Sequence, residues 1–263
     1  DAPHLSVDRE ELDRDTLSKL QQDCTVNLGE IVKNMIPPGN APVLIVGLGN
    51  PEITSDSLGP KVDELTMATR HLFIYMADYI EEGFVSTALF APDVMGHTGI
   101  EAADSVKAVA ATIGAKAVIT IDALAAASVA RVGSSLQITD TGITPGGGLG
   151  NIRTAISKES IGIPVIAIGV PTVISLGAIL GAALENTAVL LGKNKSAAVL
   201  DETTAADIIG TTLAGRHGDY AITPKDIDDV VTVLSKIIAL GLHLALHEAM
   251  TIENYQEYLD MRL

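Results

Sequence analysis

Residues 42–60 read PVLIVGLGNPEITSDSLGP, an apolar run followed by a glycine-rich turn and then by a Gly-Pro pair. The apolar run shows no alternation with polar residues, which is typical of a strand buried on both faces of a parallel sheet. Because proline is tolerated in the first turn of a helix, residues 60–76 are predicted to be helical. The stretch therefore predicts a strand, a turn and a helix, the unit from which parallel α/β sheets are built.

Strand and helix patterns continue to alternate along the rest of the chain. Further strands are predicted at residues 84–90, 117–122, 134–139 and 164–170, and further helices at residues 100–113 and 172–184. This order predicts an α/β fold, a mostly parallel sheet flanked by helices on both faces. No repeat or long linker divides the chain, so we expect a single domain over residues 1–263, with an N-terminal helical segment at 1–36 and a C-terminal helix at 223–255.

The composition limits the kinds of partner and surroundings that we expect for the chain. The chain carries 33 acidic and 17 basic residues, and its net charge of -16 repels phosphate backbones and disfavours direct nucleic-acid binding. A single cysteine, Cys24, excludes an internal disulfide and fits a reducing cytoplasm. The uncharged stretch 161–184 is interrupted by Pro164 and Pro171, so we interpret it as a buried strand followed by a buried helix rather than a membrane span.

Two aspartates stand where apolar strands are expected to end. Asp56 follows the strand at 42–49, and Asp122 closes the strand at 117–122. Either one alone could merely cap the following helix. The carboxyl ends of parallel strands meet at one edge of the sheet, where ligands bind, so we expect the two side chains to lie together. Two adjacent carboxyl groups supply one protonated acid and one ionised base, which predicts a carboxylate-dependent hydrolase that works through a shared water, with no metal and no cofactor, and such a pair suits peptide hydrolysis.

Other motifs favour structural roles. Residues 47–50 form half of a dinucleotide-binding fingerprint, but Glu52 stands where its third glycine is required. The glycine loop at residues 145–151 is not followed by the Gly-Lys-Ser/Thr of a phosphate-binding loop. His243 and His247 lie four residues apart without a visible third ligand, so ordinary surface or packed histidines are favoured over a zinc site.

Several long motifs, taken in order, resemble the germination protease (spore protease) family. They are SDSLGP (55–60), APDVMGHTGIE (91–101), ITIDALAA (119–126), LQITDTGITPGGGLGN (136–151) and GIPVIAIGVPTVI (162–174), and the match extends over residues 40–255. The resemblance implies an atypical aspartic endopeptidase that cleaves small acid-soluble spore proteins, after a glutamate, during germination. It also implies a homotetramer, made as a zymogen, in the cytoplasm of the spore core.

The resemblance further implies roles for individual residues. Asp56 and Asp122 match the catalytic pair of the family. Gly47, Gly49 and Asn50 match the turn that supports the loop holding the first aspartate. The implied fold is phosphorylase/hydrolase-like and related to that of hydrogenase maturation proteases, which agrees with the sheet expected from the residue pattern.

The chain also departs from the family pattern. His97 lies in a matching motif after a predicted strand end, and we expect it to bind substrate or support the site without a more specific role. Ala127 stands where relatives usually have arginine, and Ser175 stands where they usually have aspartate. Relatives carry further residues ahead of the segment that resembles residues 1–12. These departures leave open a catalytically inactive relative that only binds protein.

Two other classes stay open. A hydrogenase-maturation-type peptidase would bind nickel between acidic residues and a histidine, a set that Asp56, Asp122 and His97 could imitate. A peptidyl-tRNA hydrolase is suggested by LIVGLGNP at residues 44–51 and by Thr-Arg-His at residues 69–71, although such enzymes are usually basic. The leading expectation is a protease with protein substrates, assembled as a homo-oligomer, with no direct contact to nucleic acid or membrane.

Overall fold

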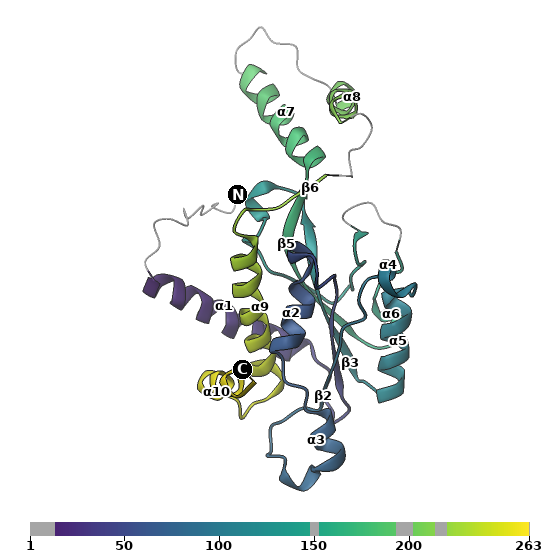
Figure 1. Ribbon diagram of the computed structural model, residues 1–263, viewed down its shortest axis with the longest axis vertical. Helices are drawn as coiled ribbons and strands as arrows, with labels where there is room; N and C mark the ends of the chain where they lie inside the picture. The colour runs from purple at the N-terminus through teal and green to yellow at the C-terminus, as the bar shows by residue number, and fades with distance from the viewer. Residues whose placement is uncertain (1–13, 148–152, 193–201, 214–219, 263) are drawn as a thin grey trace.

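The computed structural model describes residues 14–147, 153–192, 202–213 and 220–262, and within them the strands form one six-stranded sheet (Figure 1). The strands are β1 (Val43–Gly47), β2 (Thr87–Phe90), β3 (Ala117–Ala126), β4 (Gln137–Thr139), β5 (Val165–Ser175) and β6 (Ala221–Ile222). The helices are α1 (Arg14–Met35), α2 (Leu58–Leu65), α3 (Arg70–Tyr75), α4 (Met95–Thr98), α5 (Ala102–Ile113), α6 (Lys158–Ile161), α7 (Leu176–Gly192), α8 (Glu202–Thr212), α9 (Ile227–Leu246) and α10 (Ile252–Arg262). Short 3-10 helices lie at η2 (Thr54–Asp56), η3 (Ala77–Tyr79) and η4 (Val129–Arg131).

The sheet is mostly parallel, as the uninterrupted apolar runs predict. Its order is β2-β1-β3-β5-β4, and β2, β1, β3 and β5 run parallel to one another. Strands β4 and β6 pair with β5 in the antiparallel sense. Every residue of β1 is buried, which explains why this strand lacks polar alternation. The predicted fold class, a mostly parallel sheet flanked by helices, is confirmed.

Helices cover the sheet in two layers (Figure 1). Helices α1, α2 and α9 lie on one face, and α5 with α6 lies on the other. Successive side chains of β1 point to opposite layers: Val43 and Ile45 pack with the α1 and α9 side, while Leu44 and Val46 pack with the α5 side. The sheet is thus the shared middle layer of two apolar cores.

The helix predicted over residues 60–76 is wrong, because it is broken into α2 and α3. At the break, the Thr69 hydroxyl donates to the Val85 carbonyl at 2.7 Å, and the Thr69 N–H donates to the Thr87 carbonyl at 3.0 Å. These bonds to the beginning of β2 take the chain out of helical geometry. The strand predicted over residues 84–90 is shorter than expected and begins at Thr87.

Strands β3 and β5 are longer than the sequence predicted. The expectation that Asp122 closes its strand is wrong, because β3 continues to Ala126. Residues 123–126 contain only alanine and leucine, which suit a helix as well as a strand, but here they pair in parallel with β5. Strand β5 in turn runs on through Pro171 to Ser175.

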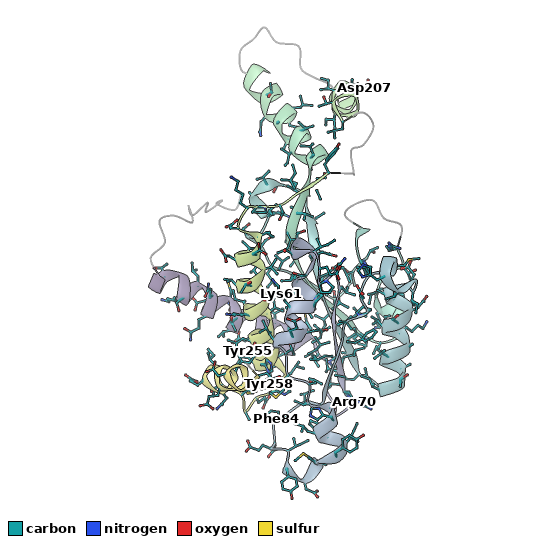
Figure 2. All side chains as sticks on the ribbon, in the orientation of Figure 1. Lys61, Arg70, Phe84, Asp207, Tyr255 and Tyr258 are labelled. Carbon is teal, nitrogen blue, oxygen red and sulfur yellow. The ribbon has the colours of Figure 1, made fainter. Side chains whose placement is uncertain are left out.

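Helix α7 is not the buried helix that the sequence predicted. It begins at Leu176, since β5 takes up the residues before it. Figure 1 shows α7 and α8 standing out from the body as an arm, and Figure 2 places Asp207 of α8 far from the sheet. Among residues 176–187 no side chain is buried. The apolar composition of this helix did not reveal that the body leaves it uncovered.

Helix α9 runs along one face of the sheet and ends at Leu246, so the single C-terminal helix predicted at residues 223–255 is wrong; α10 is separate. Thr223 does not cap α9, because its hydroxyl donates to the Thr172 carbonyl at 2.9 Å. Of the helices in the described ranges, α9 is the one that could cross a membrane by length and composition, with 61% of its most apolar window buried in the protein. It packs on α1 and α2, as the core helix of a globular domain does.

Two histidines near the end of α9 pack inside the protein. His243 Nε2 accepts the Met67 N–H at 3.1 Å, and His247 Nδ1 accepts the Val85 N–H at 3.3 Å. Tyr255 of α10, which Figure 2 labels, packs on His243 with ring centroids 4.6 Å apart. Burial lowers the pKa of His243 to about 3 and that of His247 to about 4, so both are neutral. Of the two ordinary roles that the sequence left open, surface or packed, both histidines have the packed one.

Candidate active site

A pocket of about 460 Å³ opens at the carboxyl edge of the parallel strands. The turn after β1, the later residues of β3 and β5, and the segments around α4 and residues 144–147 form its walls. Its lining includes Gly49, Asp56, Asp93, Asp122, Arg153 and Thr172. The two aspartates that the sequence singled out therefore face one shared cavity.

Asp122 lies inside β3, one residue beyond the point where the neighbouring strand β1 stops opposite Ile121. It is 3% exposed, and its Oδ1 accepts the Ala123 N–H at 2.9 Å. Within the described ranges no hydrogen-bond partner reaches Oδ2. Burial, and after it the charge of Asp56, raises the pKa of Asp122 to about 8. The side chain is therefore protonated at neutral pH.

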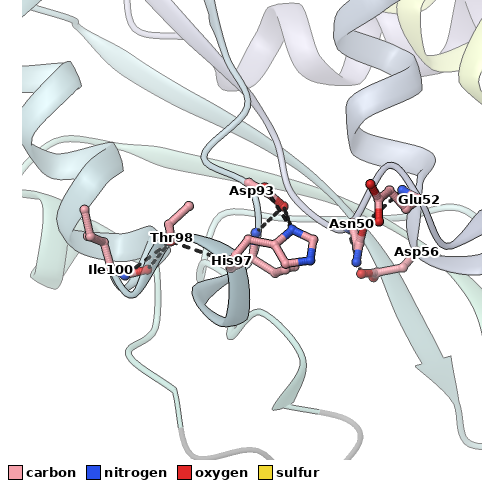
Figure 3. A network of polar contacts seen from close by, with 8 residues as sticks. Asn50, Glu52, Asp56, Asp93, His97, Thr98 and Ile100 are labelled. Carbon is pink, nitrogen blue, oxygen red and sulfur yellow. Dashed lines mark hydrogen bonds and ion pairs between the residues drawn. The ribbon is translucent and has the colours of Figure 1, made fainter.

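Asp56 reaches the pocket from η2, later than the strand-end placement predicted from the sequence. Its Oδ2 accepts the Asn50 N–H at 2.8 Å, and this bond folds the turn back toward the end of β1 (Figure 3). Asn50 Oδ1 in turn accepts the Glu52 N–H at 2.9 Å. Burial raises the pKa of Asp56, and the Asn50 N–H opposes that shift because it favours the charged form. The carboxyl group thus closes the turn rather than capping α2.

Glycines allow this turn to lie close to the sheet. Gly49 has a φ of 116°, in the left-handed region, and a Cβ there would collide with the Asp56 carbonyl. A Cβ on Gly59 of α2 would collide with the backbone of Leu48, and a Cβ on Gly47 would collide with the Gly59 carbonyl. The sequence pattern identified Gly47 and Gly49 but missed Gly59, which read only as the beginning of a helix.

Two polar residues beside the site were also missed. Asp63 of α2 accepts the Gly47 N–H at 3.2 Å, and burial raises its pKa to about 8. Thr172 of β5 donates its hydroxyl to the Ser55 carbonyl at 2.6 Å. Neither contact belongs to a local motif, since each joins segments that are separated along the chain. For Thr172 the available signal was a polar residue within an apolar strand pattern, and Asp63 of α2 had no such signal.

His97 is not among the described residues that line the pocket. It is exposed on α4, and its Nδ1 lies 3.1 Å from Oδ2 of Asp93, which does line the pocket (Figure 3). The Val94 N–H, and after it His97, lowers the pKa of Asp93. His97 therefore contacts the site through Asp93, and in the described part of the chain it is not grouped with Asp56 and Asp122 as a metal-ligand set.

The two residues that we expect to depart from the family pattern lie at strand ends. Ala127 directly follows β3 and is exposed. Ser175 ends β5, and its Oγ accepts the Ala178 N–H at 3.1 Å, as a capping residue does at the beginning of a helix. Arg153 places a cation in the pocket wall, with its guanidinium 3.7 Å from the Glu101 carboxylate. Ser175 thus has a structural role, because it caps the beginning of α7, the first helix of the arm.

The fold and the pocket define a class, the α/β proteins that place two carboxyl groups at the carboxyl edge of a mostly parallel sheet. A comparison with protein families places the chain within it: the germination protease family matches residues 6–198. The chain belongs to the germination protease family. Membership identifies it as a peptidase, with a place in spore germination.

Individual relatives agree with this assignment. The chain is 35% identical to the germination protease of Clostridium acetobutylicum over 272 residues, which cover 99% of this chain and 81% of the relative. It is 40% identical to that of Clostridium tetani over 82% of this chain and 70% of the relative. It is 35% identical to the germination protease of Bacillus subtilis, over 93% of this chain and 78% of the relative.

Among solved structures, the NiFe hydrogenase maturation protease HycI from Thermococcus kodakarensis matches 81% of this chain and 98% of its own chain. The TM-score is 0.37 and the sequence identity is 14%. At this level of likeness, the mostly parallel sheet seen here remains the basis for the fold assignment.

Proposed function

We propose that this peptidase is an atypical aspartic endopeptidase in which Asp56 and Asp122 activate water to cleave small acid-soluble spore proteins during germination. One observation carries the proposal: both carboxyl groups line one pocket, and the charge of Asp56 helps to raise the pKa of Asp122. A pair coupled in this way supplies an acid and a base at near-neutral pH. The substrate class follows from the family resemblance.

Asp122 is the acid of the pair and Asp56 is the base. Asp122 is almost inaccessible, and the described residues offer its Oδ2 no hydrogen-bond donor, so its neutral form is favoured. Asp56 is less buried and accepts the Asn50 N–H, which stabilises its charged form. Burial raises both pKa values, but the Asn50 N–H offsets part of the rise at Asp56 and the pKa of Asp122 reaches about 8, so Asp122 keeps its proton where Asp56 is ionised.

The proposed reaction begins when the Asp56 carboxylate takes a proton from water as the water oxygen attacks the scissile carbonyl carbon. Asp122 then donates its proton to the leaving amine nitrogen while the C–N bond breaks. At the end of a turnover Asp56 is protonated and Asp122 is ionised. Transfer of one proton from Asp56 to Asp122, directly or through water, restores the starting state, so the pair titrates as a unit.

From the family we also propose that the protein is a homotetramer in the cytoplasm of the spore core and that it is made as a zymogen. Light scattering of the purified protein tests the assembly, which a monomeric mass at working concentration would contradict. Mass spectrometry of the chain at successive stages from spore formation to germination tests the zymogen, because activation removes an N-terminal segment.

The activity is tested by digestion of a small acid-soluble spore protein with wild type, Asp56→Asn and Asp122→Asn, each with and without a chelator. We expect wild type to cleave in both conditions and each variant to lose roughly 10²- to 10⁴-fold, the usual contribution of a general acid or base. Asp104→Asn, an exposed acid on α5, is the matched control.

Three outcomes would contradict the proposal. Near-wild-type cleavage by either folded aspartate variant would exclude the catalytic role of the aspartate pair. Cleavage abolished by the chelator would point to a metal-dependent peptidase. Failure of wild type to cleave would point to a relative that only binds protein.

A further inference from the structure

Thr172 occupies an irregular position in β5. The parallel register with β3 skips it, passing from Pro171 to Val173, so Thr172 has no partner on β3 and forms a bulge. Proline has no N–H to donate to a neighbouring strand and is found in sheets at such interruptions. Bulges change the direction of a side chain and are frequent beside active sites. The sequence Pro171-Thr172 therefore has a local reason to turn this threonine out of the regular pattern.

The side chain of Thr172 is bonded to the turn that carries Asp56. Thr172 is fully buried, and its hydroxyl donates to the Ser55 carbonyl at 2.6 Å. Ser55 and Asp56 are consecutive residues of η2. The bond therefore joins the turn to β5, while the Asn50 N–H joins it to the end of β1.

The backbone of the bulge also makes a hydrogen bond of its own. The Thr172 carbonyl accepts the hydroxyl of Thr223 at 2.9 Å, from the segment between β6 and α9. The backbone of the bulge thus has a second bond, independent of the turn. A threonine held in this way offers Ser55 a fixed donor rather than a mobile one.

We propose that Thr172 is a positioning residue for the aspartate pair, whose hydroxyl holds the turn of Ser55 and Asp56 against β5 so that the Asp56 carboxyl group faces Asp122. The proposal rests on the proposed function of the pair. It assigns Thr172 no contact with substrate; its effect passes through Asp56.

The test compares variants that differ in the hydroxyl alone. Thr172→Val keeps the branched shape and removes the donor, and Thr172→Ser keeps the donor on a smaller side chain. Thr172→Ala matches the serine variant in size without the hydroxyl, so the serine–alanine comparison stands even if the valine variant does not fold. The control is Thr120→Val in β3, because Thr120 is equally buried and its hydroxyl has no partner among the described residues.

Steady-state cleavage of a small acid-soluble spore protein is measured for each variant across pH. We expect Thr172→Val and Thr172→Ala to lower kcat by roughly 10- to 100-fold with KM unchanged, as for a misplaced catalytic group. The basic limb of their pH profile should move to lower pH, because a displaced Asp56 raises the pKa of Asp122 less. Thr172→Ser and Thr120→Val should retain the wild-type profile.

Two results would overturn the proposal. One is a serine variant as impaired as the alanine variant, which would make the hydroxyl irrelevant. The other is a lower kcat in the valine and alanine variants with an unshifted pH profile, which would indicate general loss of packing. Failure of the proposed function is recognised separately, by an active Asp56→Asn variant, whatever the Thr172 variants do.

Discussion

The replacement Asp122→Asn should change how the stability of the protein depends on pH. Asparagine can keep the bond that Oδ1 accepts from the Ala123 N–H, and it imitates the protonated acid because it carries no charge. The folded protein holds the pKa of Asp122 at about 8, against 3.8 for an ordinary aspartate. A raised folded-state pKa stabilises the protein fully below the unfolded pKa, and this contribution is lost as the pH rises through the folded pKa.

The size of the effect follows from the shift. At about 1.36 kcal/mol for each pKa unit, a change from 3.8 to about 8 corresponds to a loss on the order of 5 kcal/mol between pH 4 and pH 8. Asp122→Asn has no carboxyl group at this position, so it does not lose this stability as the pH rises. Its unfolding free energy should therefore exceed that of wild type increasingly as the pH rises to 8, and the difference should then level off.

Urea unfolding at pH 5, 6, 7 and 8 measures this difference, provided that the denaturant slope stays constant. The buried histidines contribute equally to both proteins and cancel in the comparison. Asp93→Asn is a control of opposite sign: the pKa of Asp93 is lowered, so its contribution disappears only in acid and that variant should run parallel to wild type from pH 5 to 8. Parallel curves for wild type and Asp122→Asn would refute a protonated, buried Asp122.

Three further predictions concern the surroundings of the pair. Gly49→Ala should cost at least about 1 kcal/mol of stability and most of the cleavage activity, because the new Cβ would collide with Asp56 and φ is positive there. Gly99 also has a positive φ but lies in open space, so Gly99→Ala should retain activity. Equal losses for the two variants, in thermal melting and in digestion, would contradict this. His97→Ala should change the unfolding free energy by less than about 1 kcal/mol, since its ion pair is exposed, and a larger loss would show a buried role. His243→Asn should lose less unfolding free energy than wild type as the pH falls from 6.5 toward 3, because the lowered pKa of His243 makes the folded wild type lose stability over that range; equal losses in urea unfolding at several pH values would exclude that role.

The sequence predicted the sheet because uninterrupted apolar runs have few alternatives to buried parallel strands. It predicted that Asp56 and Asp122 lie at one edge of the sheet, because strand edges gather side chains from different parts of the chain. The length of β3 was not predictable, since an Ala-Leu segment takes strand geometry only when β5 pairs with it. The exposure of α7 was missed because apolarity does not show what covers a helix.

The polar contacts around the pair depend on tertiary structure. Asp63 and Thr172 act on loops that lie beside them only in the folded chain. Gly59 looked like an ordinary residue of the first helical turn, although its missing side chain lets α2 approach β1. Local pattern therefore gave the two carboxyl groups, and folding supplied the residues that surround them.

In the proposed mechanism Asp122 carries the proton and Asp56 the charge within one pocket, and the measurement we would make first is the pH profile of kcat for cleavage of a small acid-soluble spore protein. We expect a bell-shaped profile that falls in acid, as Asp56 gains a proton, and falls again above about pH 8, as Asp122 loses its own. A rate that stays level or keeps rising well above pH 8, with the protein still folded, would contradict it.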